Sequence, residues 1–272
     1  LKKSSNVGTI MWAQGLGEKR LYERLASFGL GQATGLELPG ETRGSLPGQS
    51  KWSGTSLPTI AIGQGVAVTP MQMLVAYSAI ANEGKRPAPS LVLGTRDSSG
   101  LFEIMNSELP ERIFSTETSD LLIEMMEGVV TEGTGTEAQV PGYRVAGKTG
   151  TAWKPLDGGG YGDETGEQKY VASFAGFLPA DDPELSIIVV IDEPVGSTYS
   201  GGKAAAPVFA EFAQFAVRQL RIPSEVERLG LEQPGRVIAT TPAQAREIAE
   251  AAEAAAALEE EGTEEVAAPS VG

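Results

Sequence analysis

The sequence predicts an α+β fold in which helices pack against an antiparallel β-sheet. Two observations support this. Apolar residues recur at the helical spacing of about 3.6 in the segments before residue 131, whereas three later segments alternate residue by residue as strands do. A glycine-rich loop and the turn PADDPE separate these three segments, and consecutive strands joined in this way are most simply antiparallel.

The helical segments are delimited by recognisable start and stop residues. Thr69, Pro70 and Gln72 form a capping box that starts one helix, and Gly84 ends it. Gly29 ends an earlier helix, because glycine readily takes the left-handed conformation found after many helices. That earlier helix is expected at residues 18–28, and two more are expected at residues 6–16 and 115–130.

The three strands are expected at residues 143–153, 170–178 and 185–192, followed by an amphipathic helix at residues 204–220 that is suited to cover the sheet. Two apolar stripes are interpreted as packing faces and not as ligand sites. The stripe on the last helix contains Val208, Phe209, Phe212, Phe215 and Ala216. The stripe on helix 115–130 contains Leu121, Leu122, Met125, Met126 and Val129.

A change of composition near Ile222 divides the chain into a domain, residues 1–222, and an acidic C-terminal tail, residues 223–272. The tail holds eleven acidic residues and three arginines, is rich in Ala and Glu, and is poor in aromatic residues. Such a segment buries too little apolar surface to offset the entropy cost of ordering, so we expect it to be largely disordered. One short helix, capped by Thr241 and ended by Gly262, is expected within it, either exposed or docked on a partner.

The composition excludes several chemistries. The 272 residues include no histidine and no cysteine, which rules out a Ser-His-Asp triad, a thiolate nucleophile and an ordinary His/Cys zinc site. No glycine-rich phosphate or dinucleotide loop is followed by a helix. We therefore expect neither a metal nor a cofactor, and the net charge of −15 argues against nucleic acid as a partner. Acid–base chemistry must fall to Lys, Asp, Glu, Tyr or hydroxyl groups.

The stretch GYRVAGKTGTAWKP places Lys148, Thr149, Gly150 and Thr151 on the first expected strand. If that strand is an edge, a peptide can pair alongside it, and the ammonium and two hydroxyls suit a peptide carboxylate. The alternative is a surface strand whose lysine is merely solvated. A K-T-G triplet is weak evidence alone, because chance produces it in roughly one chain in fifteen.

A second triplet strengthens the first. Ser4, Ser5 and Asn6 form an S-x-N sequence before K-T-G, and this pair of signatures is found in penicillin-recognising serine acyl transferases. More narrowly, the chain resembles the transpeptidase domain of class B penicillin-binding proteins, which crosslink the cell wall in division or elongation. The stretches that carry the resemblance, in the family's order, are SSNVG, GLELPGETRG, AIGQGVAVTPMQM, GKTGTA and GGKAAAPVF.

The resemblance implies a role for each motif residue. Ser4 would relay protons, the Asn6 amide would orient the acyl group, and Lys148 would stabilise both the relay and the substrate carboxylate. Residues 149–151 would form the substrate-binding segment: Thr149 and Thr151 through their hydroxyls, and the Thr151 N–H as half of the oxyanion hole.

The resemblance further implies a penicillin-binding protein or serine β-lactamase-like fold and a stem peptide ending in D-Ala-D-Ala as substrate. β-Lactams, which mimic that dipeptide, would trap the enzyme. The family acts at the extracytoplasmic face of the membrane, anchored by an N-terminal segment that this chain does not include. Its expected partners are membrane proteins of the divisome or elongasome.

One family motif is not present where it is expected. The S-x-x-K nucleophile should precede S-x-N, but this chain begins three residues before Ser4, so we expect the fold to be incomplete at its N-terminus and the isolated chain to be inactive. Ser200 and Lys203 form an S-x-x-K after K-T-G, and we interpret it as a decoy, because two intervening glycines disfavour a helical turn. The alternatives are a β-lactamase or D-alanyl carboxypeptidase, or a non-catalytic fragment that binds stem peptides or division partners.

Overall fold

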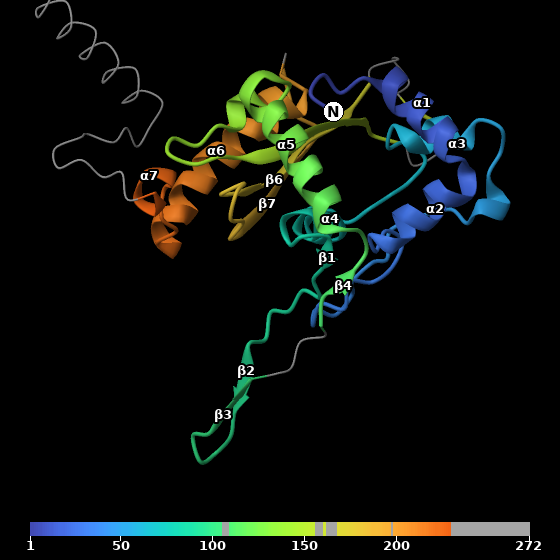
Figure 1. Ribbon diagram of the computed structural model, residues 1–272. Coiled ribbons are helices and arrows are strands. Elements are labelled where there is room, and N and C mark those ends of the chain that lie inside the picture. Colours follow the sequence, from blue (N-terminus) through green and yellow to red (C-terminus); the bar gives the residue numbers. More distant parts are fainter. Residues whose placement is uncertain (105–108, 156–159, 162–167, 197, 230–272) are drawn as a thin grey trace, which may run out of the picture.

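The computed structural model describes residues 1–104, 109–155, 160–161, 168–196 and 198–229. Its central feature is an antiparallel sheet with the strand order β5-β6-β7, so β5 and β7 form the two edges (Figure 1). The strands are β5 (Ala146–Trp153), β6 (Tyr170–Leu178) and β7 (Leu185–Asp192). The expected α+β fold with an antiparallel sheet is confirmed.

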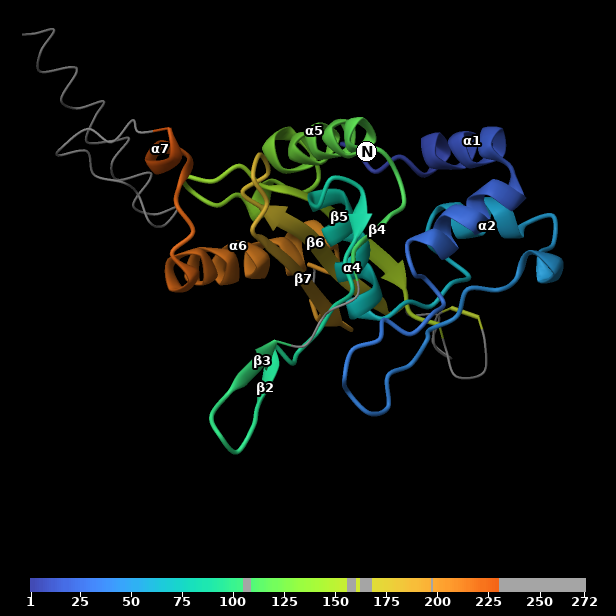
Figure 2. The same cartoon turned by 60° about the horizontal axis from the view of Figure 1, so that its bottom comes forward.

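Helices cover both faces of this sheet. Figure 2 shows α5 on one side of the strands and α6 on the other. Side chains alternate along β6, so Phe177 packs towards α4 and α5, while Phe174 packs towards α6. The described helices are α1 (Asn6–Leu16), α2 (Glu18–Ser27), α3 (Ser56–Ala61), α4 (Pro70–Ala81), α5 (Thr116–Glu132), α6 (Gly201–Leu220) and α7 (Glu225–Arg228), with 3-10 turns at Gln49–Lys51 and Thr136–Ala138.

Two small two-stranded sheets accompany the central one. β1 (Lys85–Arg86) pairs with β4 (Glu111–Arg112), and β2 (Gly94–Arg96) pairs with β3 (Phe102–Ile104) in a hairpin that projects from the body (Figure 1). The sequence did not predict these strands or α3, because each contains only two to six residues and shows no clear periodicity.

The capping box at the start of α4 is confirmed and also has a tertiary role. Thr69 Oγ1 accepts a hydrogen bond from Gln72 N at 3.1 Å, and Gln72 Oε1 accepts one from Thr69 N at 2.9 Å. The Gln72 side chain is buried, and its amide donates to the carbonyl oxygens of Gln32 and Arg43. The first turn of α4 therefore also holds the preceding loop.

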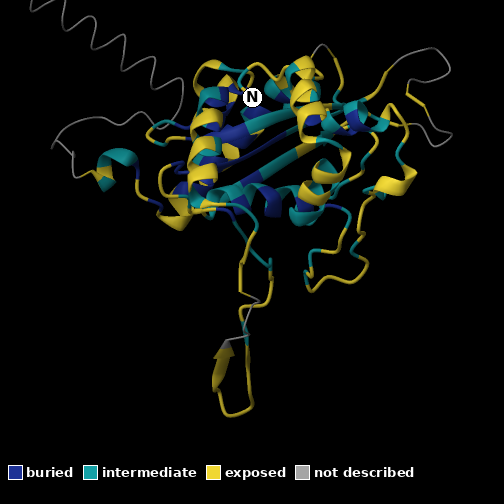
Figure 3. Ribbon diagram, turned by 45° about the vertical axis from the view of Figure 1, so that its right-hand side comes forward, coloured by how far each residue is buried: buried dark blue, intermediate teal, exposed yellow. Residues whose placement is uncertain are grey.

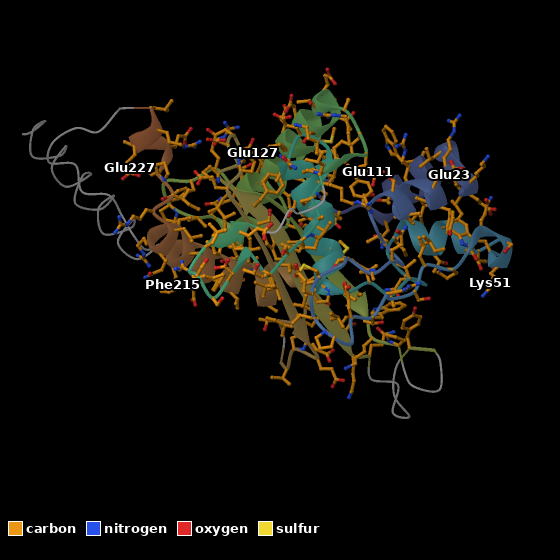
Figure 4. The ribbon with its side chains drawn as sticks, turned by 90° about the horizontal axis from the view of Figure 1, so that it is seen from below. Glu23, Lys51, Glu111, Glu127, Phe215 and Glu227 are labelled. Atoms are coloured by element: carbon orange, nitrogen blue, oxygen red, sulfur yellow. The ribbon has the colours of Figure 1, made fainter. Side chains whose placement is uncertain are left out.

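The predicted packing face of α6 is wrong for three of its five residues. Val208, Phe212 and Phe215 are 44–53% exposed, and Figure 4 shows Phe215 at the periphery of the molecule. Small residues allow the helix to approach the sheet closely, and Phe209 contacts Phe174 edge to face, with ring centroids 4.7 Å apart. The other side chains buried on this face belong to Ala205, Ala206, Ala210, Ala213, Ala216 and Val217.

The predicted face of α5 is wrong in the same way. Leu121 and Met125 are about half exposed, while Met126 and Val129 are buried. Figure 3 shows this division between the buried and the exposed sides of the helices around the sheet. The apolar stripe predicted from the residue spacing is wider than the surface of α5 that is buried, because β5 and α4 contact only part of that stripe.

The residues just after Ile222 belong to the packed body. Ser224 caps α7, Glu225 N donates to Gly142 O at 3.0 Å, and Arg228 pairs with Asp181 at 2.8 Å. Residues 230–272, including the helix expected from Thr241, lie outside the described residues. The division of the chain at residue 222 stays a prediction. Among the helices that are described, none combines the length and apolarity needed to cross a membrane.

A cluster of charges at the end of β7 makes stability sensitive to acid. Glu193 accepts hydrogen bonds from Lys154 and Lys169, each at 2.8 Å, and these lower its pKa from 4.5 to about 2. Because the folded pKa lies below the unfolded value, this stabilisation is present above pH 4.5 and is lost as the pH falls towards 2. We expect Glu193→Gln to reduce the decrease in Tm between pH 5 and pH 2.5, whereas Glu211→Gln, on the exposed side of α6, should not. Equal decreases in both variants would contradict this assignment.

Candidate active site

The two predicted motifs meet in space. Lys148 Nζ, on β5, donates a hydrogen bond to Ser4 Oγ at 3.0 Å, although 144 positions separate the two residues in sequence. Ser4 lies in the short segment before α1 and is exposed. The pairing therefore joins the N-terminal segment to the edge strand of the sheet.

The N-terminal segment is fixed against the end of α5. Lys2 forms an ion pair with Glu132, and the Lys2 carbonyl lies so close to Gly133 that a Cβ on that glycine would approach it to 2.7 Å. Ser4 itself has φ of 51°, in the left-handed region that few non-glycine residues occupy. Strain of this kind is concentrated at functional sites. Here it accompanies a tight turn, closed by Ser4 N donating to Leu1 O at 2.9 Å, that presents the hydroxyl to Lys148.

The rest of the S-x-N motif forms the start of α1. Ser5 Oγ caps the helix by accepting from Gly8 N at 3.2 Å. Asn6 is the first helical residue and is exposed, and its side-chain amide has no hydrogen-bond partner among the described residues. The structure thus brings Ser4 to Lys148, whereas the Asn6 side chain forms no hydrogen bond with another site residue among the described residues.

Lys148 is held by several acceptors while half-buried. Besides Ser4, its ammonium donates to Thr149 O at 2.9 Å and to Thr149 Oγ1 at 3.3 Å. Burial lowers the pKa of Lys148, because desolvation disfavours the charged form. A lysine that is desolvated beside a hydroxyl is suited to exchange protons with it or to bind an anion.

K-T-G lies on an edge strand, which is the condition for a peptide to pair alongside it. Within the described part of the chain, β5 pairs with β6 on one side and with no strand on the other. Lys154 N donates to Lys169 O at 2.8 Å, and in an antiparallel ladder alternate residues make the cross-strand bonds. Counting back along this register, the N–H and C=O groups of Thr149 and Thr151 point to the free edge, where an extended peptide can pair with them.

Three residues around the K-T-G segment were not singled out from the sequence as site residues. Thr134 Oγ1 lies 2.8 Å from Thr149 Oγ1, and Gly201 N donates to Thr151 Oγ1 at 3.0 Å. Ser173 lies opposite Gly150, where a Cβ would approach its Oγ to 2.4 Å, so a larger residue at this position of the motif would have to displace the Ser173 hydroxyl. Thr134 and Ser173 belong to no motif. Gly201 is part of the GGKAAAPVF stretch. That stretch supported the family resemblance but did not indicate that Gly201 contacts Thr151.

The expectation that two intervening glycines disfavour a helical turn at the second S-x-x-K sequence is wrong, because α6 begins at Gly201. Ser200 is the N-cap, and Lys203 Nζ forms an ion pair with Glu137 Oε1 at 3.0 Å. The Lys203 ammonium is thus hydrogen-bonded to a carboxylate and not to Ser200. That Ser200 is not a nucleophile stays a prediction.

Comparisons with known proteins show the family of this chain. The family described as the penicillin binding protein transpeptidase domain matches residues 1–214. Penicillin-binding protein PbpB of Mycolicibacterium smegmatis is 42% identical over 81% of this chain and 35% of its own length. Peptidoglycan D,D-transpeptidase FtsI of Escherichia coli K12 is 34% identical over 85% of this chain and 37% of its own length.

Solved structures show the same similarity. The crystal structure of penicillin binding protein 3 from Mycobacterium tuberculosis in complex with ampicillin has a TM-score of 0.74 and 35% identity, over 88% of this chain and 53% of that one. The chain spans about a third of the length of the curated relatives it matches. Its sequence, its fold and its pairing of S-x-N with K-T-G identify it as a member of the penicillin-binding protein transpeptidase domain family, of the class B type.

Proposed function

We propose that this chain is the part of a D,D-transpeptidase that binds the stem peptide and relays protons during peptidoglycan crosslinking. The observation that carries the proposal is the 3.0 Å hydrogen bond from Lys148 to Ser4 beside the open edge of β5. This contact places a relay hydroxyl, an ammonium and a peptide-binding strand edge together. The serine nucleophile and its lysine, in the S-x-x-K motif, are contributed by residues N-terminal to Leu1.

In the proposed reaction, the D-Ala-D-Ala end of a stem peptide pairs along β5. Lys148, Thr149 and Thr151 bind its carboxylate, and the Thr151 N–H stabilises the developing oxyanion. The serine attacks the penultimate carbonyl, the peptide bond to the last D-Ala breaks, and a proton relayed through Ser4 allows free D-Ala to leave. Asn6 orients the acyl group while an amine of a neighbouring stem attacks the ester. This second step forms the crosslink and regenerates the serine.

A location and a class of partner accompany this function. Peptidoglycan lies outside the cell membrane, so the proposed site works on the extracytoplasmic face, with an N-terminal segment of the full-length protein as anchor. The proposed partners are membrane proteins of the divisome or elongasome. Support comes from relatives named peptidoglycan D,D-transpeptidase and penicillin-binding protein, of whose own length this chain covers about a third.

Removing the Thr149 and Thr151 hydroxyls tests the proposed carboxylate site. In the full-length protein, Thr149→Val and Thr151→Val each keep the side-chain shape but remove a donor to the carboxylate. We expect each to raise the barrier to acylation by a labelled penicillin by about 1–3 kcal/mol. Thr131→Val, on the exposed side of α5, is the matched control and should react at the wild-type rate. Wild-type rates in all three variants would show that β5 does not hold the carboxylate.

The fate of the acyl group separates transpeptidation from the alternatives. The full-length protein, given a D-Ala-D-Ala stem peptide and an amine acceptor, should form the crosslinked product. Release of the shortened peptide without crosslinking would instead indicate a carboxypeptidase. Rapid turnover of a chromogenic cephalosporin would indicate a β-lactamase, and absence of any acylation would indicate a binding role.

A further inference from the structure

We propose that Gly201 is a positioning residue, whose backbone N–H at the start of α6 aims the Thr151 hydroxyl proton at the substrate carboxylate. The inference rests on the proposed function and adds a residue outside the two motifs. It starts from the hydrogen bond in which Gly201 N donates to Thr151 Oγ1 at 3.0 Å. This bond connects the first residue of a helix to the side chain of an edge strand 50 positions earlier.

The direction of this hydrogen bond determines what Thr151 can offer. A hydroxyl has one proton to donate and two lone pairs to accept with. Because the Gly201 N–H can only donate a hydrogen bond, the Thr151 oxygen must accept it, and the hydroxyl proton of Thr151 must point elsewhere. Thr149 Oγ1 also accepts, from Lys148 Nζ, and it lies 2.8 Å from Thr134 Oγ1, where either hydroxyl can be the donor. The Thr151 hydroxyl proton has no acceptor among the described residues, so the fold leaves it for a ligand.

Only glycine permits this approach. A Cβ on Gly201 would lie 2.3 Å from the carbonyl oxygens of both Gly150 and Ser173, and a Cβ on Gly202 would lie 2.3 Å from Thr134 O. Contacts this short with backbone atoms cannot be relieved by a side-chain rotation. The two glycines therefore let the end of α6 lie directly on β5 and β6, which brings the N–H within reach of Thr151.

The helix adds an electrostatic contribution at the same point. The N-terminal end of α6, a helix of 20 residues, carries a partial positive charge from its aligned peptide dipoles. The first N–H of α6, that of Gly201, donates to the Thr151 hydroxyl oxygen. A hydroxyl whose oxygen already accepts a hydrogen bond is a stronger donor to an anion. Gly201 thus acts on a carboxylate through Thr151 and not by contact.

The test compares an acid with its neutral ester. In the full-length protein, the acylation rates with benzylpenicillin and with its methyl ester give a ratio that reports recognition of the carboxylate. We expect Gly201→Ala to lower this ratio about tenfold, by weakening one charge-assisted hydrogen bond. Gly128→Ala is the matched control, because a Cβ at that α5 position meets no atom within 4 Å, and it should keep the wild-type ratio. Adding Thr151→Val to Gly201→Ala should lower the ratio no further than Thr151→Val alone.

The outcomes separate this proposal from the one on which it rests. A wild-type ratio near one would contradict the proposed carboxylate site itself. A high wild-type ratio that Gly201→Ala leaves unchanged would overturn the positioning role alone. Should Gly201→Ala prevent folding, glycolic acid at position 201 replaces the N–H by an ester oxygen without adding a Cβ. That variant is expected to show the same tenfold loss, and a wild-type ratio in it would overturn the proposal.

Discussion

Replacing Lys148 by methionine in the full-length protein is expected to lower the rate of acylation by a penicillin about a thousandfold. Methionine keeps much of the lysine side-chain volume but removes the ammonium, which donates to Ser4 Oγ and to Thr149. The substitution therefore removes both the proton relay and a carboxylate ligand, a larger effect than the loss of one threonine hydroxyl. The second-order rate constant for labelling with a fluorescent penicillin measures it.

The matched control for this effect is Lys85→Met. Lys85, on β1, forms an ion pair with Glu83 at 2.7 Å, and its side chain is 38% exposed. Exposed ion pairs contribute little to stability, so this variant should label at the wild-type rate. A Lys148→Met protein that labels as fast as the control, with an unchanged Tm, would remove Lys148 from the catalytic machinery.

The second large effect concerns the chain of 272 residues as it stands. We expect it to form no covalent adduct with a labelled penicillin, although Ser4, Asn6 and Lys148 are all present. In the proposed mechanism the serine that forms the covalent bond is not among these 272 residues, and without it only binding and part of the oxyanion hole remain. Circular dichroism must first show that the isolated chain is folded, and intact-mass spectrometry then measures the adduct. An added mass of one penicillin would contradict the prediction.

The sequence predicted the order and type of the main elements because each has a strong local signal. The capping box at Thr69 and Gln72 and the alternation in β6 and β7 do not depend on distant residues. The pairing of Ser4 with Lys148 was accessible only through the family resemblance, because nothing local connects residues 144 positions apart. Its geometry comes from the tight turn at Ser4, which the sequence did not indicate.

The faces of α5 and α6 could not be predicted from periodicity alone. An apolar stripe shows that a helix packs but not how closely, and on α6 the alanines, together with Phe209, face the sheet while Phe212 and Phe215 stay exposed. The contacts of Gly201 with Thr151, and of Thr134 with Thr149, depend on how a helix end and a loop meet β5. Tertiary packing determines such contacts, and no sequence motif indicates that these residues contact the site.

Peptide mapping of the full-length protein after reaction with penicillin tests the central claim most directly. Digestion and mass spectrometry identify the serine that carries the penicilloyl group. The proposed division of labour, with Ser4 and Lys148 as relay and binding groups, predicts the adduct on a serine N-terminal to Leu1, followed three residues later by a lysine. An adduct on Ser4 or Ser200 would contradict it.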